Sequence, residues 1–147
     1  MGKINELLES IDAEAFRHAV PLQLRFNDID VLGHVNNNAQ LALFDVGKTS
    51  FDKEVRGVVR DWDKVDTMIV NINCTFMQQI HFTDPMEVRT RVKKVGGKSY
   101  VLQQILRNTA TGAICSLSES VMVSIDYESK QTREIPAGFA SRLREWM

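Results

Sequence analysis

Two carboxylates and a run of amide side chains lie close together in residues 27–38. Asp28 and Asp30 are two positions apart, so on an extended backbone their side chains point the same way. A carboxylate beside a buried, apolar helix can have a shifted pKa and act as a base or a nucleophile. These residue types predict acid–base or nucleophilic chemistry, and their spacing does not choose between the two aspartates.

Asn36, Asn37 and Asn38 follow at the expected start of a helix. Asparagine is a preferred N-cap because its side chain accepts a hydrogen bond from a first-turn N–H group. The remaining first-turn N–H groups form the positive end of the helix dipole and can hold a developing oxyanion. A carboxylate next to such donors suits the hydrolysis of an activated acyl group.

Each of these residues also has a purely structural interpretation. Asp28 or Asp30 can close an Asx turn, the asparagines can cap the helix, and Gly33 can supply a positive φ angle. His34 can be a loop histidine whose hydrogen bonds are satisfied. The residue types alone leave both interpretations open.

The elements around this loop are expected to be a strand and one long helix. Residues 22–28 alternate apolar and polar side chains, which predicts a strand, and residues 38–54 predict a helix that stops near Gly57. The first half of that helix, "AQLALFDVG", is apolar on nearly every side. An all-round apolar helix is a buried helix.

After the helix, period-two patterns predict long strands joined by short turns at 96–98 and 108–112, which require antiparallel neighbours. One face of the first of these strands is expected to carry Met68, Val70, Ile72, Cys74 and Phe76. Short helices are expected over 3–17 and in "FASRLREW". One buried helix against one antiparallel sheet gives an α+β architecture in which the sheet curls around the helix.

Composition fits one domain of 147 residues, with 44% apolar and 25% charged residues. The net charge of -1 offers no excess of positive charge for nucleic acid, so none is expected as a partner. Cys74 and Cys115 lack metal-ligand spacing, so no metal is expected and both thiols are expected to be reduced. Without a bilayer-spanning stretch or an apolar signal core, no membrane partner and a cytoplasmic location are expected.

The pattern Arg25-Phe26-x-Asp28-x-Asp30-x-x-Gly33-His34-Val35-Asn36-Asn37 resembles the signature of the hot-dog thioesterases of the 4-hydroxybenzoyl-CoA thioesterase type. The later elements follow the order of that family, so the resemblance covers about residues 20–140 of a single domain over 1–147. It implies the hot-dog fold, an antiparallel sheet wrapped around one long central helix. It also implies hydrolysis of an acyl-CoA thioester to free acid and thiol, with no cofactor beyond the coenzyme A of the substrate.

The resemblance implies that Asp30 is the catalytic aspartate and that Asp28 is structural. Asp30 would attack the thioester carbonyl or activate a water, while the backbone N–H group of Asn37 would polarise the carbonyl oxygen. Five further residues would shape or line the substrate pocket: Gly33, His34, Asn36, Gln40 and Asp45.

The chain departs from the family where side chains would meet the acyl group. Family members often carry an aromatic residue in place of Gln40, Glu in place of Asp45, and Ala-Arg in place of Gly47-Lys48. These departures leave the acyl group undetermined. In related branches an acid on the helix performs the catalysis, which makes Asp45 the second candidate for the catalytic carboxylate.

Coenzyme A would need cations for its phosphates. The candidate patch lies around the turn at 96–97 and consists of Arg91, Lys93, Lys94 and Lys98, for which a solvated strand face is the alternative. The family resemblance also implies a homodimer or homotetramer with acyl-CoA bound at the subunit interface. Two other functions stay open: a non-catalytic acyl-CoA-binding or sensing module, and a thioesterase that acts on acyl-carrier protein.

Overall fold

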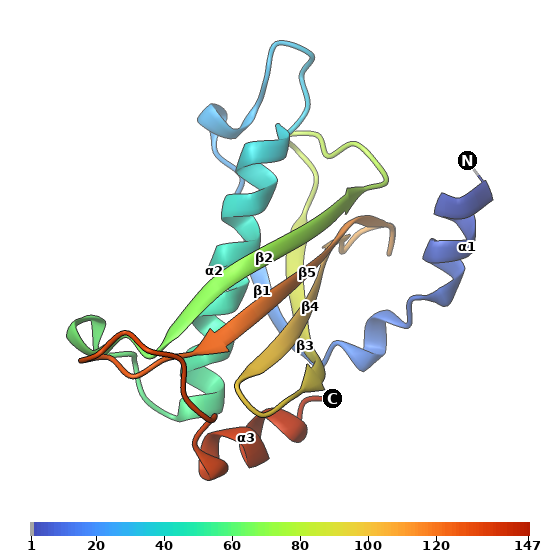
Figure 1. The fold of residues 1–147 in the computed structure, drawn as a ribbon. Helices are drawn as coiled ribbons and strands as arrows, with labels where there is room; N and C mark the ends of the chain where they lie inside the picture. Colours follow the sequence, from blue (N-terminus) through green and yellow to red (C-terminus); the bar gives the residue numbers. More distant parts are fainter. Residues whose placement is uncertain (1) are drawn as a thin grey trace.

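The computed structural model describes residues 2–147 as one antiparallel sheet wrapped around a long helix (Figure 1). The five strands lie in the order β1-β3-β4-β5-β2. Their bounds are β1 His18–Leu22, β2 Thr67–Phe76, β3 Met86–Val95, β4 Ser99–Asn108 and β5 Ile114–Ser124. The helices are α1 Gly2–Ser10, α2 Asn37–Arg56 and α3 Ala137–Arg144. The predicted α+β architecture is confirmed.

The central helix α2 packs mainly on one side of the concave face, against β1, β3 and β4. The helix comes closest at Gly47, where an added Cβ would lie 2.7 Å from the side chains of Gln104 and Val88. Gln104 Nε2 donates hydrogen bonds of 3.0 Å to the Phe44 carbonyl and to Thr90 Oγ1. A glycine at this position therefore lets the helix dock directly on β3 and β4.

The first predicted strand is displaced toward the N-terminus. β1 ends at Leu22, and Phe26–Asp28 forms a 3-10 turn instead of the end of a strand. The Asp28 carboxylate accepts the Arg25 N–H group at 2.8 Å and turns the chain. Phe26, which continues the apolar alternation, is therefore 84% exposed.

A β-bulge in β2 changes which side chains face the helix. The register with β5 shifts between Ile69 and Asn71, so Ile69, and not Met68, shares a face with Ile72. One extra residue reverses the two-residue period of a strand. The prediction that Met68 lies on the same face as Ile72 and the alternate residues after it is therefore wrong.

The helix α2 begins one residue earlier than predicted and ends at Arg56, where Gly57 caps it with a φ angle of 76°. Its first half is not buried on every side, because Ala42, Asp45 and Val46 are exposed. The helix packs on β1, β3 and β4 and makes fewer contacts with β5 and β2, the last two strands on the other side of the sheet. Its uncovered side therefore faces open space above those two strands.

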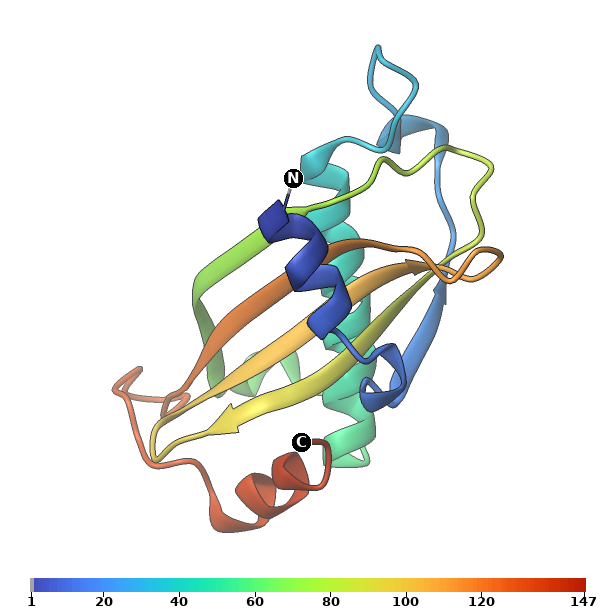
Figure 2. The ribbon, with the colours of Figure 1, turned by 90° about the vertical axis from the view of Figure 1, so that its right-hand side faces the viewer.

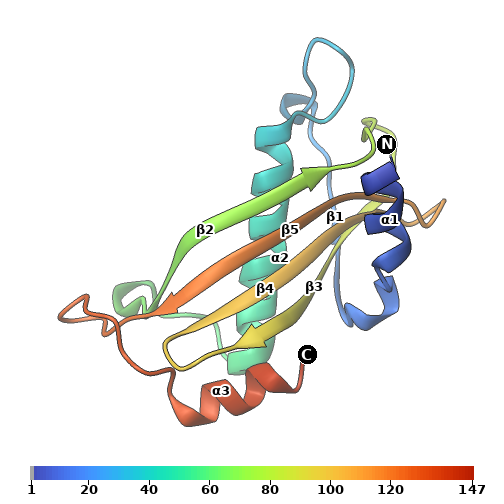
Figure 3. The same cartoon turned by 45° about the vertical axis from the view of Figure 1, so that its right-hand side comes forward.

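The N-terminal segment lies on the convex face of the sheet, opposite to α2 (Figures 2 and 3). The predicted helix over 3–17 is divided, because Asp12 caps a separate 3-10 turn at Ala13–Ala15. Phe16 packs with Ile105 and Leu117 on this face.

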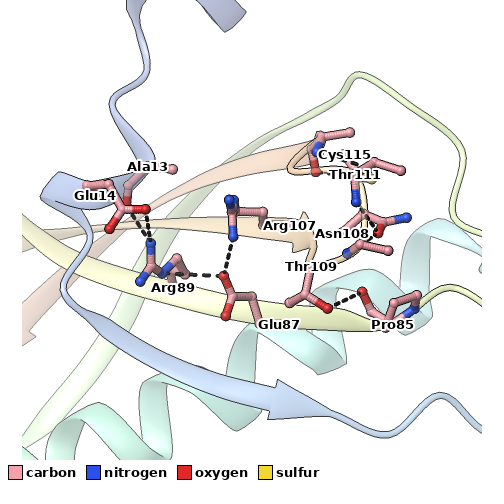
Figure 4. A network of polar contacts seen from close by, with 12 residues as sticks. Ala13, Glu14, Pro85, Glu87, Arg89, Arg107, Asn108, Thr109, Thr111 and Cys115 are labelled. Atoms are coloured by element: carbon pink, nitrogen blue, oxygen red, sulfur yellow. Dashed lines mark hydrogen bonds and ion pairs between the residues drawn. The ribbon is translucent and has the colours of Figure 1, made fainter.

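A polar network attaches the same segment to the strands (Figure 4). Arg89 donates a 3.1 Å hydrogen bond to the Ala13 carbonyl, and Glu87 pairs with Arg107 at 3.1 Å. The segment thus covers part of the convex face. Within residues 2–147, no helix is long and apolar enough to cross a membrane.

Candidate active site

The motif loop lies at one end of α2, beyond the end of the sheet (Figure 1). Asp28 is buried there, and its carboxylate accepts hydrogen bonds from the Arg25 backbone N–H at 2.8 Å and the Arg25 guanidinium at 3.1 Å. Its backbone carbonyl accepts the Asn36 N–H group at 2.9 Å. Asp28 therefore holds the shape of the loop, and neither carboxylate oxygen is free.

Asp30 is only partly engaged by the loop. Its Oδ1 accepts the N–H groups of Leu32 at 2.9 Å and His34 at 3.3 Å, while Oδ2 has no hydrogen bond within residues 2–147. Gly33 has a φ angle of 81° and donates to the Asp30 carbonyl at 3.0 Å. Asp30 thus closes an Asx turn with one oxygen and presents the other.

The first turn of α2 supplies unbonded donors. Asn36 is the N-cap, and its side chain accepts the Ala39 N–H group at 2.7 Å. The Gln40 N–H group donates to the Asn36 carbonyl, which leaves the N–H groups of Asn37 and Asn38 without an acceptor among the described residues. These two donors stand at the positive end of the helix dipole.

The carboxylate and the donors share one cavity of about 600 Å³. From the motif it is lined by Asp30, Leu32, His34, Val35, Asn36, Asn37, Asn38 and Gln40. Gln40 is buried, and its Oε1 has no hydrogen-bond partner within residues 2–147. The structure therefore brings together most of the predicted site residues, while Gly33 lies at the loop tip.

The opposite wall of this cavity was not predicted from the sequence. It consists of Phe76, Met77, Gln78 and Gln79, at the end of β2 and just after it. The next residues hold the loop in place, since the Ile80 carbonyl accepts the Val35 N–H at 2.8 Å and the rings of His34 and His81 lie 5.2 Å apart. No local sequence signal marks these residues, because only long-range pairing brings them to the motif.

Asp45 lies outside this cavity. Its side chain is 65% exposed and contacts Lys48 Nζ at 3.4 Å. Both residues line a second cavity of about 950 Å³, between the later turns of α2 and strands β2, β4 and β5. This cavity is larger, but it contains none of the motif residues at 25–37, so the smaller one is the candidate active site.

A charged network borders the larger cavity. Asp52 accepts hydrogen bonds from Arg56 at 2.8 Å and from Arg60 at 2.7 Å, and Arg56 also pairs with Asp66 at 3.0 Å. Burial would raise the pKa of Asp52, but the hydrogen bonds from Arg60 and Arg56 outweigh it and hold that pKa below its usual value. The network ties the segment at 57–66 to α2.

The proposed phosphate patch lies at the other end of β3. Arg91 stacks over the Phe16 ring at 5.6 Å, and Lys93 pairs with Glu119 at 2.7 Å, while Lys94 and Lys98 are exposed. A ten-residue strand such as β3 is about 30 Å long. Within one chain the patch is therefore far from Asp30, and its role in binding coenzyme A stays a prediction. Among residues 2–147, no cluster of three or more His, Cys, Asp or Glu could hold a metal.

Comparisons with known proteins reveal a family match and similar folds. The profile of the thioesterase-like superfamily matches residues 24–143. The uncharacterized protein YsmA of Bacillus subtilis (strain 168) is 23% identical over 108 residues, which are 74% of this chain and 72% of that protein.

Two solved structures share the fold. A predicted thioesterase from Bacillus stearothermophilus has a TM-score of 0.81 at 19% identity, over 88% of this chain and 95% of that one. A thioesterase of Thermus thermophilus, solved with coenzyme A and Zn, has a TM-score of 0.72 at 20% identity, over 87% and 92% of the two chains. These likenesses confirm the predicted hot-dog fold.

Proposed function

The chain belongs to the thioesterase-like superfamily, and we propose that it hydrolyses the thioester of an acyl-coenzyme A to a free acid and a thiol. One observation carries the proposal. The free Oδ2 of Asp30 shares a cavity with two first-turn N–H groups that have no acceptor among the described residues. A nucleophile or base beside such donors is the arrangement that acyl transfer requires.

In the proposed reaction, the thioester carbonyl oxygen accepts hydrogen bonds from the N–H groups of Asn37 and Asn38. Asp30 Oδ2 then attacks the carbonyl carbon or removes a proton from an attacking water. The tetrahedral intermediate carries its negative charge on the oxygen that these donors hold. Its collapse breaks the carbon–sulfur bond and releases the thiolate, which takes up a proton. If Asp30 has attacked directly, water hydrolyses the resulting anhydride.

The other cavity residues position these groups. The N–H groups of Leu32 and His34 fix Asp30 Oδ1, so that Oδ2 keeps one orientation. Asn36 caps the helix and keeps its first turn in place. Gln40 has a buried, unpaired acceptor in the same cavity, which we propose contacts the acyl group.

We further propose that two copies pair through β2 to form a homodimer. This strand is an edge of the sheet, its sequence TMIVNINCTF has no charged residue, and Ile69, Val70 and Ile72 are exposed. Edge strands that stay unpaired are usually protected by charges or proline. If the two β2 strands pair in antiparallel orientation, the Phe76 end of one strand lies beside the Thr67 end of the other. Phe76 lines the smaller cavity and Thr67 lines the larger one, so the smaller cavity of each copy would adjoin the larger cavity of its partner. Assembly into tetramers stays a prediction.

Asp30→Asn tests the catalytic proposal. The substituted amide can still accept the loop N–H groups through Oδ1, but it is neither a nucleophile nor a base. We expect kcat for acyl-CoA hydrolysis to fall about a thousandfold or more, with an unchanged melting temperature. A thiol-release assay over a panel of acyl-CoA thioesters measures the rate, and retained turnover would refute the role of Asp30.

Asp28→Asn is the matched control. It lies in the same loop but holds backbone and guanidinium groups, so we expect it to lower stability more than it lowers kcat. Binding of acyl-CoA by the wild type without turnover of any panel member would favour a sensing module. Turnover of acyl-carrier-protein thioesters alone would favour the protein-bound substrate.

A further inference from the structure

A nearly buried lysine lines the larger cavity. Lys48 is 8% exposed, and its Nζ makes one polar contact within residues 2–147, at 3.4 Å to the mostly exposed Asp45. An ammonium group has three N–H donors. Burial lowers the pKa of Lys48, while the charge and hydrogen bond of Asp45 act in the opposite direction. Donors of Lys48 are therefore available in a place with little water.

Unpaired hydroxyl groups lie on β5, next to the strand on which the neighbouring Gly47 docks. Ser116, Ser118 and Ser120 on β5 are buried, and their Oγ atoms have no hydrogen-bond partner within residues 2–147. Ser118 pairs directly with Cys74 of β2, and directly paired residues share one face of a sheet. The charge of Lys48 acts on the Cys74 thiol, opposing the burial that raises the pKa of that thiol to about 11. Ser118 also pairs with Gln104, on which Gly47 docks, so Ser118 and Cys74 lie on the face of the sheet that carries α2 and Lys48.

This part of the sheet adjoins the candidate active site. Phe76 lines the cavity of Asp30, and Cys74 lies two positions before it on the same face of β2. Two residues of a strand cover about 7 Å. Asn37 and Lys48 are eleven residues apart on α2, which is about 16 Å along the helix axis. A helical side chain leans toward the start of its helix, so the lysine covers part of that distance and an acyl chain of about five or six carbons covers the rest.

The other basic side chains that line the larger cavity are either paired with a carboxylate or exposed to solvent. Arg60 is bound to Asp52, and Lys53 is exposed. Lys48 is thus the buried basic residue of this cavity that retains free donors among the described residues.

We propose that Lys48, together with Ser118, binds a carboxylate at the far end of the acyl group, so that the substrate is the coenzyme A thioester of a short dicarboxylic acid. This inference rests on the proposed function and adds the substrate class. A carboxylate accepts several hydrogen bonds and neutralises a buried ammonium, which matches the groups that lack partners here. The exposed Asp45 can turn toward water when the ligand carboxylate replaces it.

Kinetics on matched thioesters test the inference. Succinyl-, glutaryl- and adipyl-CoA are compared with butyryl-, valeryl- and hexanoyl-CoA, which have equal chain lengths but end in a methyl group. We expect the wild type to favour the carboxylate member of at least one pair about tenfold or more in kcat/KM. Lys48→Met should abolish or reverse that preference, mainly through KM.

Lys3→Met is the control, because it removes an equal charge from an exposed position on the convex side of the sheet, which lines neither cavity. We expect it to leave the preference unchanged. The inference is overturned if the wild type favours the methyl member of every pair. It is also overturned if Lys48→Met lowers kcat/KM equally for the carboxylate and the methyl member. Should Lys48→Met fail to fold, Ser118→Ala is expected to reduce the preference about threefold.

Two results separate this inference from the proposed function. If the wild type hydrolyses methyl-ended thioesters as well as or better than their carboxylate partners, and Asp30→Asn abolishes that activity, the thioesterase stands and the dicarboxylate is wrong. If nothing is hydrolysed, calorimetric titration of the same pairs still measures the preference. We expect Lys48→Met to weaken binding of the carboxylate member alone by about tenfold, and equal binding of both members to the wild type refutes the inference.

Discussion

The two halves of the concave face differ sharply although they belong to one sheet. Under α2, strands β3 and β4 present buried apolar side chains, such as Val88, Val92 and Leu106. Beyond the helix, β5 and β2 present small hydroxyl side chains and exposed apolar ones, such as Ser118 and Ile72. The first half is filled by the chain itself, whereas the second leaves polar groups unpaired and apolar groups exposed. We infer that the first half stabilises the fold and that the second provides the proposed carboxylate site and dimer interface.

The largest effect is expected from removing a buried side chain of the half that α2 covers. Phe44 is 0% exposed and packs on that half, so Phe44→Ala should lower the free energy of unfolding by about 4 kcal/mol through the cavity it leaves. Guanidinium denaturation measures this loss. Ile72→Ala, at a residue that is 44% exposed, should cost less than about 1 kcal/mol in the dilute monomer. Similar costs at both positions would remove the distinction between the halves.

The uncovered half can be tested through assembly. Ile72→Lys places a charge at the proposed β2 interface, so we expect the dimer dissociation constant to rise about 100-fold, which is about 2.7 kcal/mol. Sedimentation velocity over a concentration series measures the change. Thr83→Lys, at an exposed residue outside β2, should leave it unaltered. A wild type that stays monomeric at high micromolar concentration would refute pairing through β2.

Asp52 lies between the two halves, where its ion pairs with Arg56 and Arg60 tie the segment at 57–66 to α2. Asp52→Asn weakens its pairs with Arg56 and Arg60 and should cost about 2 kcal/mol at pH 7. Because the folded-state pKa of Asp52 is lowered from 3.8, its contribution is present above that pH and is lost as the pH falls further. Urea denaturation at pH 7 and pH 3 should therefore show the variant closer to the wild type in acid. An equal difference at both values would contradict the ion-pair account.

The smallest effect concerns His18, which packs on the covered half between the rings of Phe51 and Trp146 at 5.5 and 6.0 Å. Burial lowers its pKa from 6.5, with the charge of Glu54 acting in the opposite direction. Its contribution is therefore present above about pH 6.5 and is lost as the pH falls through the folded-state pKa. His18→Gln should flatten the change in stability between pH 7 and pH 5. An NMR titration in which the His18 pKa lies above 6.5 would contradict this.

The sequence by itself determined the features that depend on near neighbours in the chain. The asparagine run predicted the start of α2 to within one residue, and Gly57 predicted its end. Caps and turns form within about four residues, so their signals can be read locally. Strand alternation likewise predicted β3, β4 and β5, and the motif loop predicted one wall of the smaller cavity but not the wall after β2.

Only the tertiary structure decided which faces meet. A bulge at Ile69 and Asn71 moved Met68 to the opposite face of β2, and the docking of Gly47 on β3 and β4 left one side of α2 uncovered. The same docking put Asp45 outside the cavity of Asp30 and left Lys48 nearly buried. These outcomes depend on pairings between residues far apart in the sequence, and hydrophobic periodicity along one segment carries no information about them.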